Sequence, residues 1–143
     1  MFSEPLSYFH DTFRLEYAEN TGAALSFGDE WPKAVGFWVL GIAPLLILVG
    51  LFIYVLTHLN KYGWFKLLSF SLVIAGGLGN IIDRIVYDRH VTDFMNMGIK
   101  DVRTGIFNVA DVCITTGIIC LFVAFRATKP AMPAQHEAEE SLT

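Results

Sequence analysis

The chain has 143 residues, of which 54% are hydrophobic and only 17% are charged, and its formal net charge is −4 at pH 7. Soluble domains carry about 25% charged residues, so this composition indicates a membrane protein with one domain. The acidic balance and the lack of a basic run argue against nucleic-acid binding.

The first 33 residues contain neither a membrane span nor a signal peptide, because no apolar core follows a basic start. Residues 13–18 alternate apolar and polar side chains, which predicts a short strand. Asn20 and Gly22 follow as turn-forming residues. We therefore expect residues 1–33 to form a small extramembrane region with short strands, which precedes the membrane domain.

Three apolar segments then follow, over residues 34–57, 67–82 and 106–125. The first contains no charge and can cross a hydrocarbon core of about 30 Å at about 1.5 Å per residue. Pro44 within it predicts a kinked helix, which membranes tolerate. The second segment is shorter, but Trp64 and Lys66 can anchor its start at the interface. The predicted fold is mainly α, a polytopic membrane protein with three transmembrane helices over residues 34–125.

Three spans also predict which parts of the chain share a face of the membrane. Residues before 34 and the loop 83–105 lie on one face, and the loop 58–66 lies on the other. The tail over residues 126–143 shares that second face and is expected to be disordered, because it is rich in Pro, Ala and Glu. Lysine and arginine counts do not decide which face is cytoplasmic, because aspartates are interleaved with the arginines of the loop 83–105.

The polar residues near the spans fall into a few short motifs. "AGGLGNIIDR" closes the second span and places Asn80, Asp83 and Arg84 on one helical face. "FNVAD" opens the third span, with Asn108 and Asp111 three residues apart. Between these motifs, "RHVTDF" carries an aspartate at position 93, and all of these residues gather at the same membrane face as Asn20.

Two carboxylates at one membrane face can perform acid–base chemistry. Held a few ångströms apart they cannot both ionise, so one keeps a proton. The ionised group can take a proton from water while the protonated group polarises a carbonyl, and this needs neither metal nor cofactor. The four histidines show no metal-ligand spacing, so we expect no metal site.

Structural roles are open for the same residues. Asp83 beside Arg84 fits a structural ion pair better than a catalyst. Asp111 could act at the helix N-terminus, where aspartate caps the chain and is favoured by the helix dipole. An ion carrier is a weaker alternative for Asp111, because the residue lies about one turn from the end of its span rather than at mid-membrane.

Four stretches, "ENTGAALSF", "GGLGNIIDR", "VTDF" and "FNVADVCI", resemble in order and approximate spacing the motifs of bacterial lipoprotein signal peptidases, also called signal peptidase II. The resemblance runs from about Phe9 to about Phe125. It implies an aspartyl endopeptidase of the bacterial inner membrane with its site near the periplasmic face. Such enzymes remove the signal peptide of prolipoproteins before a diacylglyceryl-cysteine. It further implies contact with membrane lipid, a monomeric state, and a tail on the cytoplasmic side.

The resemblance carries over to individual positions. The catalytic pair of the family falls on Asp93 and Asp111, and Asp83 falls on a supporting position. The positions that line the substrate region in similar proteins are Asn20, Gly22, Asn80, Arg84 and Asn108.

One departure from the family concerns the number of spans. Similar proteins have four, and the first, with its D-Q-x-x-K motif, has no counterpart before Phe9. A mis-assigned start or a truncated gene would explain this, as would a short variant of the family. The alternative function is therefore an inactive, truncated member that binds lipidated peptides without cleaving them.

Overall fold

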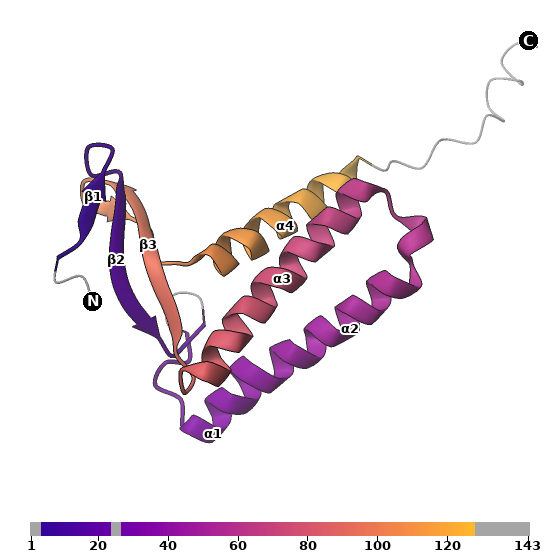
Figure 1. Ribbon diagram of the computed structural model, residues 1–143, viewed down its shortest axis with the longest axis horizontal. Helices are drawn as coiled ribbons and strands as arrows, with labels where there is room; N and C mark the ends of the chain where they lie inside the picture. The colour runs from indigo at the N-terminus through magenta and orange to yellow at the C-terminus, as the bar shows by residue number, and fades with distance from the viewer. Residues whose placement is uncertain (1–3, 24–26, 128–143) are drawn as a thin grey trace, which may run out of the picture.

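The computed structural model describes residues 4–23 and 27–127. Three long helices extend from one side of a small antiparallel sheet (Figure 1). The tail predicted to be disordered lies outside the described residues from position 128 onward.

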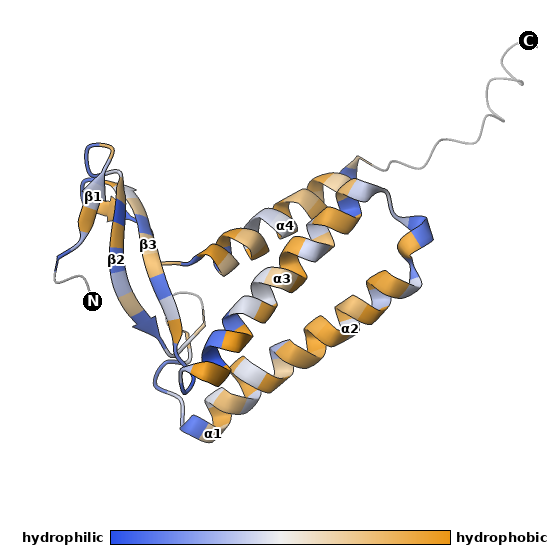
Figure 2. Ribbon diagram, viewed as in Figure 1, coloured by the Kyte–Doolittle hydropathy of each residue, from blue (hydrophilic) through white to orange (hydrophobic). Residues whose placement is uncertain are grey.

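The three predicted spans are confirmed within the described residues. The first span comprises α1 (Lys33–Gly36), a π-helical segment (Phe37–Ile42) and α2 (Ala43–Thr57). A short 3₁₀ turn (Leu59–Lys61) leads to α3 (Trp64–Val86), and α4 (Val109–Arg126) forms the third span. Each of these three units is long and apolar enough to cross a membrane. Figure 2 shows hydrophobic residues along most of α2 and hydrophilic residues at the end of α3 near the sheet.

The first span contains a wide, π-helical turn just before Pro44. Proline has no N–H for a bond to the carbonyl four residues earlier, and its ring crowds that carbonyl. The π-helical segment Phe37–Ile42 lies directly before α2, in which Pro44 occupies the first turn. The wider turn of a π-helix gives the proline ring room against the preceding turn, so the span continues without a break.

Small residues allow α3 and α4 to pack closely. A side chain at Gly76 would collide with the backbone carbonyl of Ala110 on α4. A Cβ atom at Gly117 would lie 2.8 Å from the backbone carbonyl oxygen of Ser69. Glycine on both helices therefore brings their backbones together, as is common where membrane helices meet.

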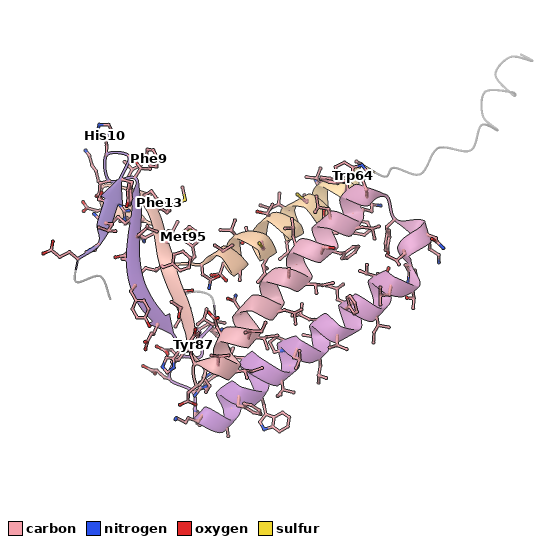
Figure 3. All side chains as sticks on the ribbon, in the orientation of Figure 1. Phe9, His10, Phe13, Trp64, Tyr87 and Met95 are labelled. Carbon is pink, nitrogen blue, oxygen red and sulfur yellow. The ribbon has the colours of Figure 1, made fainter. Side chains whose placement is uncertain are left out.

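The sheet has the order β1-β2-β3-β4, and all of its pairs are antiparallel. Its strands are β1 (Leu6–Tyr8), β2 (Phe13–Asn20), β3 (Val91–Ile99) and β4 (Val102–Arg103). The strand predicted over residues 13–18 is confirmed and extends to Asn20. Because β2 pairs with β3, the segments before the first span and after the second lie at the same end of the helices, as the number of spans predicts. Trp64 lies at the opposite end (Figure 3).

Two predicted boundaries are wrong. Residues 83–105 are not a loop, because α3 continues to Val86 and β3 and β4 follow it. The third helix begins at Val109 rather than at residue 106. Phe107 instead forms an antiparallel bridge with Met95 of β3, so its apolar side chain belongs to the sheet and not to the span.

Candidate functional site

A cavity of about 510 Å³ lies where α3, α4, the first span and the sheet meet. Polar lining residues come from β2, β3, α3, α4 and Thr104, and most of the apolar lining comes from the helices and the segment before α4. The lining residues used below are Asn20, Leu40, Pro44, Asn80, Arg84, Asp93, Thr104, Phe107 and Asp111.

Asp93 is a buried carboxylate on β3, with 3% of its surface exposed. Its Oδ1 accepts a hydrogen bond of 2.7 Å from Asn108 Nδ2, and its Oδ2 accepts one of 3.2 Å from Asn20 Nδ2. Burial raises the pKa of Asp93, and the nearby charge of Asp111 adds to this effect, whereas the two amide hydrogen bonds lower it. Asp93 is therefore the carboxyl whose surroundings favour a bound proton.

Asp111 occupies the first turn of α4 and forms a capping box with Asn108. The backbone N–H of Asp111 donates to Asn108 Oδ1 at 3.0 Å, and the backbone N–H of Asn108 donates to Asp111 Oδ2 at 3.1 Å. A capping box satisfies two backbone donors that a helix start leaves unpaired. The structural role considered for Asp111 is thus present, and it uses Oδ2, which leaves Oδ1 to accept a hydrogen bond from Asn80.

Two asparagine amides connect the two carboxyl groups. Asn80 Nδ2 donates to Asp111 Oδ1 at 2.9 Å, and Asn108 Nδ2 donates to Asn80 Oδ1 at 3.0 Å. Asn108 Nδ2 also donates to Asp93, so both hydrogens of this amide are used. The result is a continuous chain of hydrogen bonds from Asp93 through Asn108 and Asn80 to Asp111.

Arg84 fixes the turn that follows β2. Its Nη2 donates to the backbone carbonyl of Gly22 at 2.7 Å, and its Nη1 donates to the carbonyl of Asn80 at 3.2 Å. The N–H of Gly22 donates to Asn20 Oδ1 at 2.9 Å, which closes a side-chain turn. Arg84 therefore holds Asn20 in position to donate to Asp93.

The predicted ion pair between Asp83 and Arg84 is wrong for the described part of the chain, where no salt bridge joins them. Asp83 Oδ2 accepts a hydrogen bond of 3.3 Å from the backbone N–H of Thr92, and the guanidinium of Arg84 is directed to backbone carbonyls instead. Asp83 thus joins the end of α3 to the start of β3 and does not line the cavity.

The structure brings most of the predicted site residues together. The cavity is lined by Asn20, Asn80, Arg84, Asp93 and Asp111. Asn108 joins the two carboxyl groups, and the carbonyl of Gly22 accepts a hydrogen bond from Arg84.

Some lining residues were not predicted from the sequence: the apolar residues Leu40 and Pro44, and the segment from Thr104 to Phe107. The Thr104–Gly105 pair before "IFN" is the signal that could have marked that segment as a turn rather than part of a span. Among residues 4–23 and 27–127, no group of three or more His, Cys, Asp or Glu side chains could hold a metal ion.

The fold and the site thus define a polytopic membrane protein with a pair of linked carboxyl groups at one end of its spans. Residues 1–126 match the family described as signal peptidase (SPase) II, and the chain belongs to this family. Membership makes the protein a membrane protease of the lipoprotein-processing class.

Named relatives support this assignment. The lipoprotein signal peptidase of Borrelia duttonii is 33% identical over 131 residues, covering 89% of this chain and 75% of that protein. The lipoprotein signal peptidase of Thermodesulfovibrio yellowstonii is 42% identical over 109 residues, covering 76% of this chain and 67% of that protein. A solved bacterial membrane enzyme superposes with a TM-score of 0.73 at 27% identity, covering 92% of this chain and 79% of the solved chain.

Proposed function

We propose that this protein is an aspartyl endopeptidase of the bacterial inner membrane. It removes the signal peptide of prolipoproteins by cleaving before a cysteine that carries diacylglycerol. The observation that supports this proposal most directly is the hydrogen-bonded chain Asp93–Asn108–Asn80–Asp111 beside a cavity at the end of the spans.

In this proposal the two carboxyl groups share one proton and titrate as a unit. Burial of Asp93 favours the proton on that group in the resting enzyme. Asp111, in the first turn of α4, is placed where the helix dipole favours a negative charge. Asp111 then removes a proton from water, the water oxygen attacks the scissile carbonyl carbon, and Asp93 donates its proton to the carbonyl oxygen. Collapse of the tetrahedral intermediate breaks the C–N bond, the proton held by Asp111 passes to the leaving amine, and the proton on the former carbonyl oxygen returns to Asp93.

The asparagines would hold the two carboxyl groups at a fixed separation during the reaction. Amide N–H groups donate to a carboxylate and to the carbonyl oxygen of a carboxylic acid, so Asn108 and Asn80 can stay bonded as the proton moves. Substrate would reach the cavity from the lipid, its signal peptide among the helices and its diacylglycerol among the lipid tails. We place the sheet and the cavity at the periplasmic face, with the monomer as the working unit and Asp83 supporting the α3–β3 junction.

The direct test is cleavage of a diacylated prolipoprotein by the purified chain and two variants, Asp93→Asn and Asp111→Asn. Each loses a proton-transfer group but keeps a similar shape, and we expect a rate loss of about 10²- to 10⁴-fold. Asp88→Asn is the matched control, because Asp88 pairs with Lys33 at an exposed position. Full-rate cleavage by either variant would exclude the mechanism. Substrate binding by the unmodified chain without cleavage would support the inactive, peptide-binding alternative.

A further inference from the structure

A second polar cluster lies in the sheet and takes no direct part in the cavity's pair of carboxyl groups. It consists of Asp11, Asn96, Arg103 and Thr104 and is called the Arg103 cluster below. Arg103 Nε donates to Asn96 Oδ1, and Arg103 Nη1 donates to the backbone carbonyl of Asp11 at 2.8 Å. Nη1 also lies 3.6 Å from Asp11 Oδ2. One guanidinium therefore joins the β1–β2 turn to β3 and β4.

The Arg103 cluster is largely withdrawn from solvent. The side chain of Arg103 is 13% exposed and Asn96 is 5% exposed. Gly98 allows this arrangement, because a Cβ atom there would lie 2.6 Å from both Cα and Cγ of Arg103. A buried charge costs desolvation energy that ion pairing rarely exceeds. Net stability is therefore a weak reason for an arginine here, and a role in setting geometry is the stronger one.

The Arg103 cluster holds the segment that leads from β4 into α4. Asn96 Nδ2 donates to the carbonyl of Thr104 at 2.7 Å, and the N–H of Thr104 donates to the carbonyl of Met97 at 2.7 Å. Thr104 Oγ1 in turn accepts the N–H of Met97 at 3.1 Å. Further along, Phe107 and Met95 exchange two backbone hydrogen bonds of 2.8 Å. Residues 104–107 are thus fixed along β3 up to the residue before Asn108.

This arrangement relates the two carboxyl groups through the sheet. Asp93 lies on β3, three residues before Asn96 and two before Met95 (Figure 3 labels Met95). Asp111 follows the fixed segment through the capping box of Asn108. The position of Asn108 relative to Asp93 is therefore set by the pairing of residues 104–107 with β3, and the packing of α3 on α4 alone does not determine it.

We propose that Arg103 is a positioning residue that sets Asn108 and Asp111 against Asp93 by holding residues 104–107 on β3. This inference rests on the proposed aspartyl mechanism. Arg103 would not contact substrate or the reacting atoms. Its loss should lower the rate of the chemical step more than it weakens substrate binding.

The experiment uses the full chain with three substitutions, Arg103→Ala, Arg103→Lys and Arg14→Ala. Arg14→Ala is the matched control, because the side chain of Arg14 also bonds to Asp11, but through the carboxylate. The pairing of Arg14 with Asn96 of β3 involves its backbone, which the substitution leaves in place. For Arg103→Ala we expect kcat to fall about 10- to 100-fold with KM within about threefold, as a displacement near 1 Å can produce. The pH at which kcat falls to half should also move, because a displaced Asn108 changes the hydrogen bonding of Asp93. Arg103→Lys should recover part of kcat, and Arg14→Ala should match the unsubstituted chain in both readouts.

The outcomes separate this inference from the proposed mechanism. An unchanged kcat and pH profile in Arg103→Ala overturns the positioning role, while inactive Asp93→Asn and Asp111→Asn proteins leave the mechanism standing. If Arg103→Ala does not fold, Arg103→Lys decides, since lysine keeps the charge but cannot bridge Asn96 and Asp11 with a planar fork. Full kcat in a folded Arg103→Lys protein with an unchanged pH profile would then overturn the role. Activity in Asp111→Asn would overturn both proposals.

Discussion

The first span and the α3–α4 pair use glycine in opposite ways. On α3 and α4, Gly76 and Gly117 each lie against backbone atoms of the other helix. A side chain at either position would force the two helices apart. In the first span, Gly41 and Gly50 have no heavy atom of the described structure within 4 Å of a Cβ position, apart from their own helix. The first span has close contacts with side chains instead: Leu48 of α2 packs against Gly77 of α3, and Gly36 at the start of the span packs against the side chain of Arg89.

The site follows the same division. The polar helix residues that line the cavity, Asn80 and Asp111 among them, belong to α3 and α4. Leu40 and Pro44 of the first span instead form part of its apolar wall. A polar constellation needs fixed distances, and backbone contact through glycine supplies them. An apolar wall tolerates movement, because its contacts have no required direction. Under the proposed mechanism, we expect the first span to shape access to the cavity and the α3–α4 pair to hold the reacting groups. Four experiments test this difference between the two regions.

The largest effect should come from Gly76→Ala. Its Cβ would meet the carbonyl of Ala110, which directly precedes Asp111, so α4 must shift where the site is built. We expect a loss of roughly 1–3 kcal/mol of stability from overpacking. Cleavage should slow about 10²-fold as Asp111 moves. Gly50→Ala is the control and should be neutral or stabilise the helix by up to about 1 kcal/mol. Equal behaviour of the two variants in detergent unfolding and cleavage assays would remove the distinction between the regions.

The next effect concerns the two functions of Asn108. Asn108→Ser keeps an oxygen to cap α4 but loses the amide that donates to Asn80 and Asp93. We expect near-normal stability with cleavage slowed about 10- to 100-fold. Asn108→Ala should lose a further 1 kcal/mol or so of stability with the cap. Thermal unfolding and kcat measured together test this, and a serine variant with normal kcat would show that the bridge is not needed.

The third effect is on pH dependence. The pKa of Asp93 is raised by burial, so the folded protein holds this proton more tightly than the unfolded chain. The stability that Asp93 contributes is therefore complete below the ordinary carboxyl value of about 3.9 and is lost as pH rises through the raised value. Cleavage should fall over the same rise as the pair loses its shared proton. Asn20→Ala removes a hydrogen bond that lowers this pKa, so the falling limb of the rate profile should move to higher pH. A shift to lower pH would contradict this account.

The smallest effect should come from Lys33→Ala. Lys33 stands at the start of the first span, and its Nζ lies 3.3 Å from Oδ2 of Asp88 in the turn after α3. The two side chains are 81% and 79% exposed. Exposed pairs contribute about 0–1 kcal/mol. We expect unfolding and cleavage to be unchanged within error. A marked loss would show that the first span depends on this contact for its place beside α3.

Hydropathy and the number of spans predicted the helices and the shared face, because burial in lipid requires long apolar segments whatever their partners. The motifs predicted which polar residues would meet. The strand β3 was missed because its partner β2 lies far away in the sequence, and strand propensity depends strongly on such pairing. Ile106 and Phe107 look like the start of a span by composition, yet Phe107 pairs with Met95.

The side-chain contacts of Arg103 and Asn96 have no local signal in the sequence. Asn96 and Arg103 are ordinary polar residues in the sequence, and their burial depends on Gly98 and on a turn near Asp11 that is distant along the chain. The same limit explains the wrong ion pair. Arg84 is adjacent to Asp83 in sequence, but its guanidinium donates a hydrogen bond to the carbonyl of Gly22, in the turn after β2. Contacts between elements, rather than composition, decide these partners.

The hydrogen bonds of Asn108 depend on the register of α4 against α3 and β3. If the sequence of α4 were shifted by one residue against α3, the residue facing the site would change and Asp111 would lie about 100° away around the helix axis. The same amide could then no longer reach Asp93 and Asn80 together. Under the proposed mechanism, a chain with α4 in this register would be folded but inactive, because a single amide has to connect the two carboxyl groups.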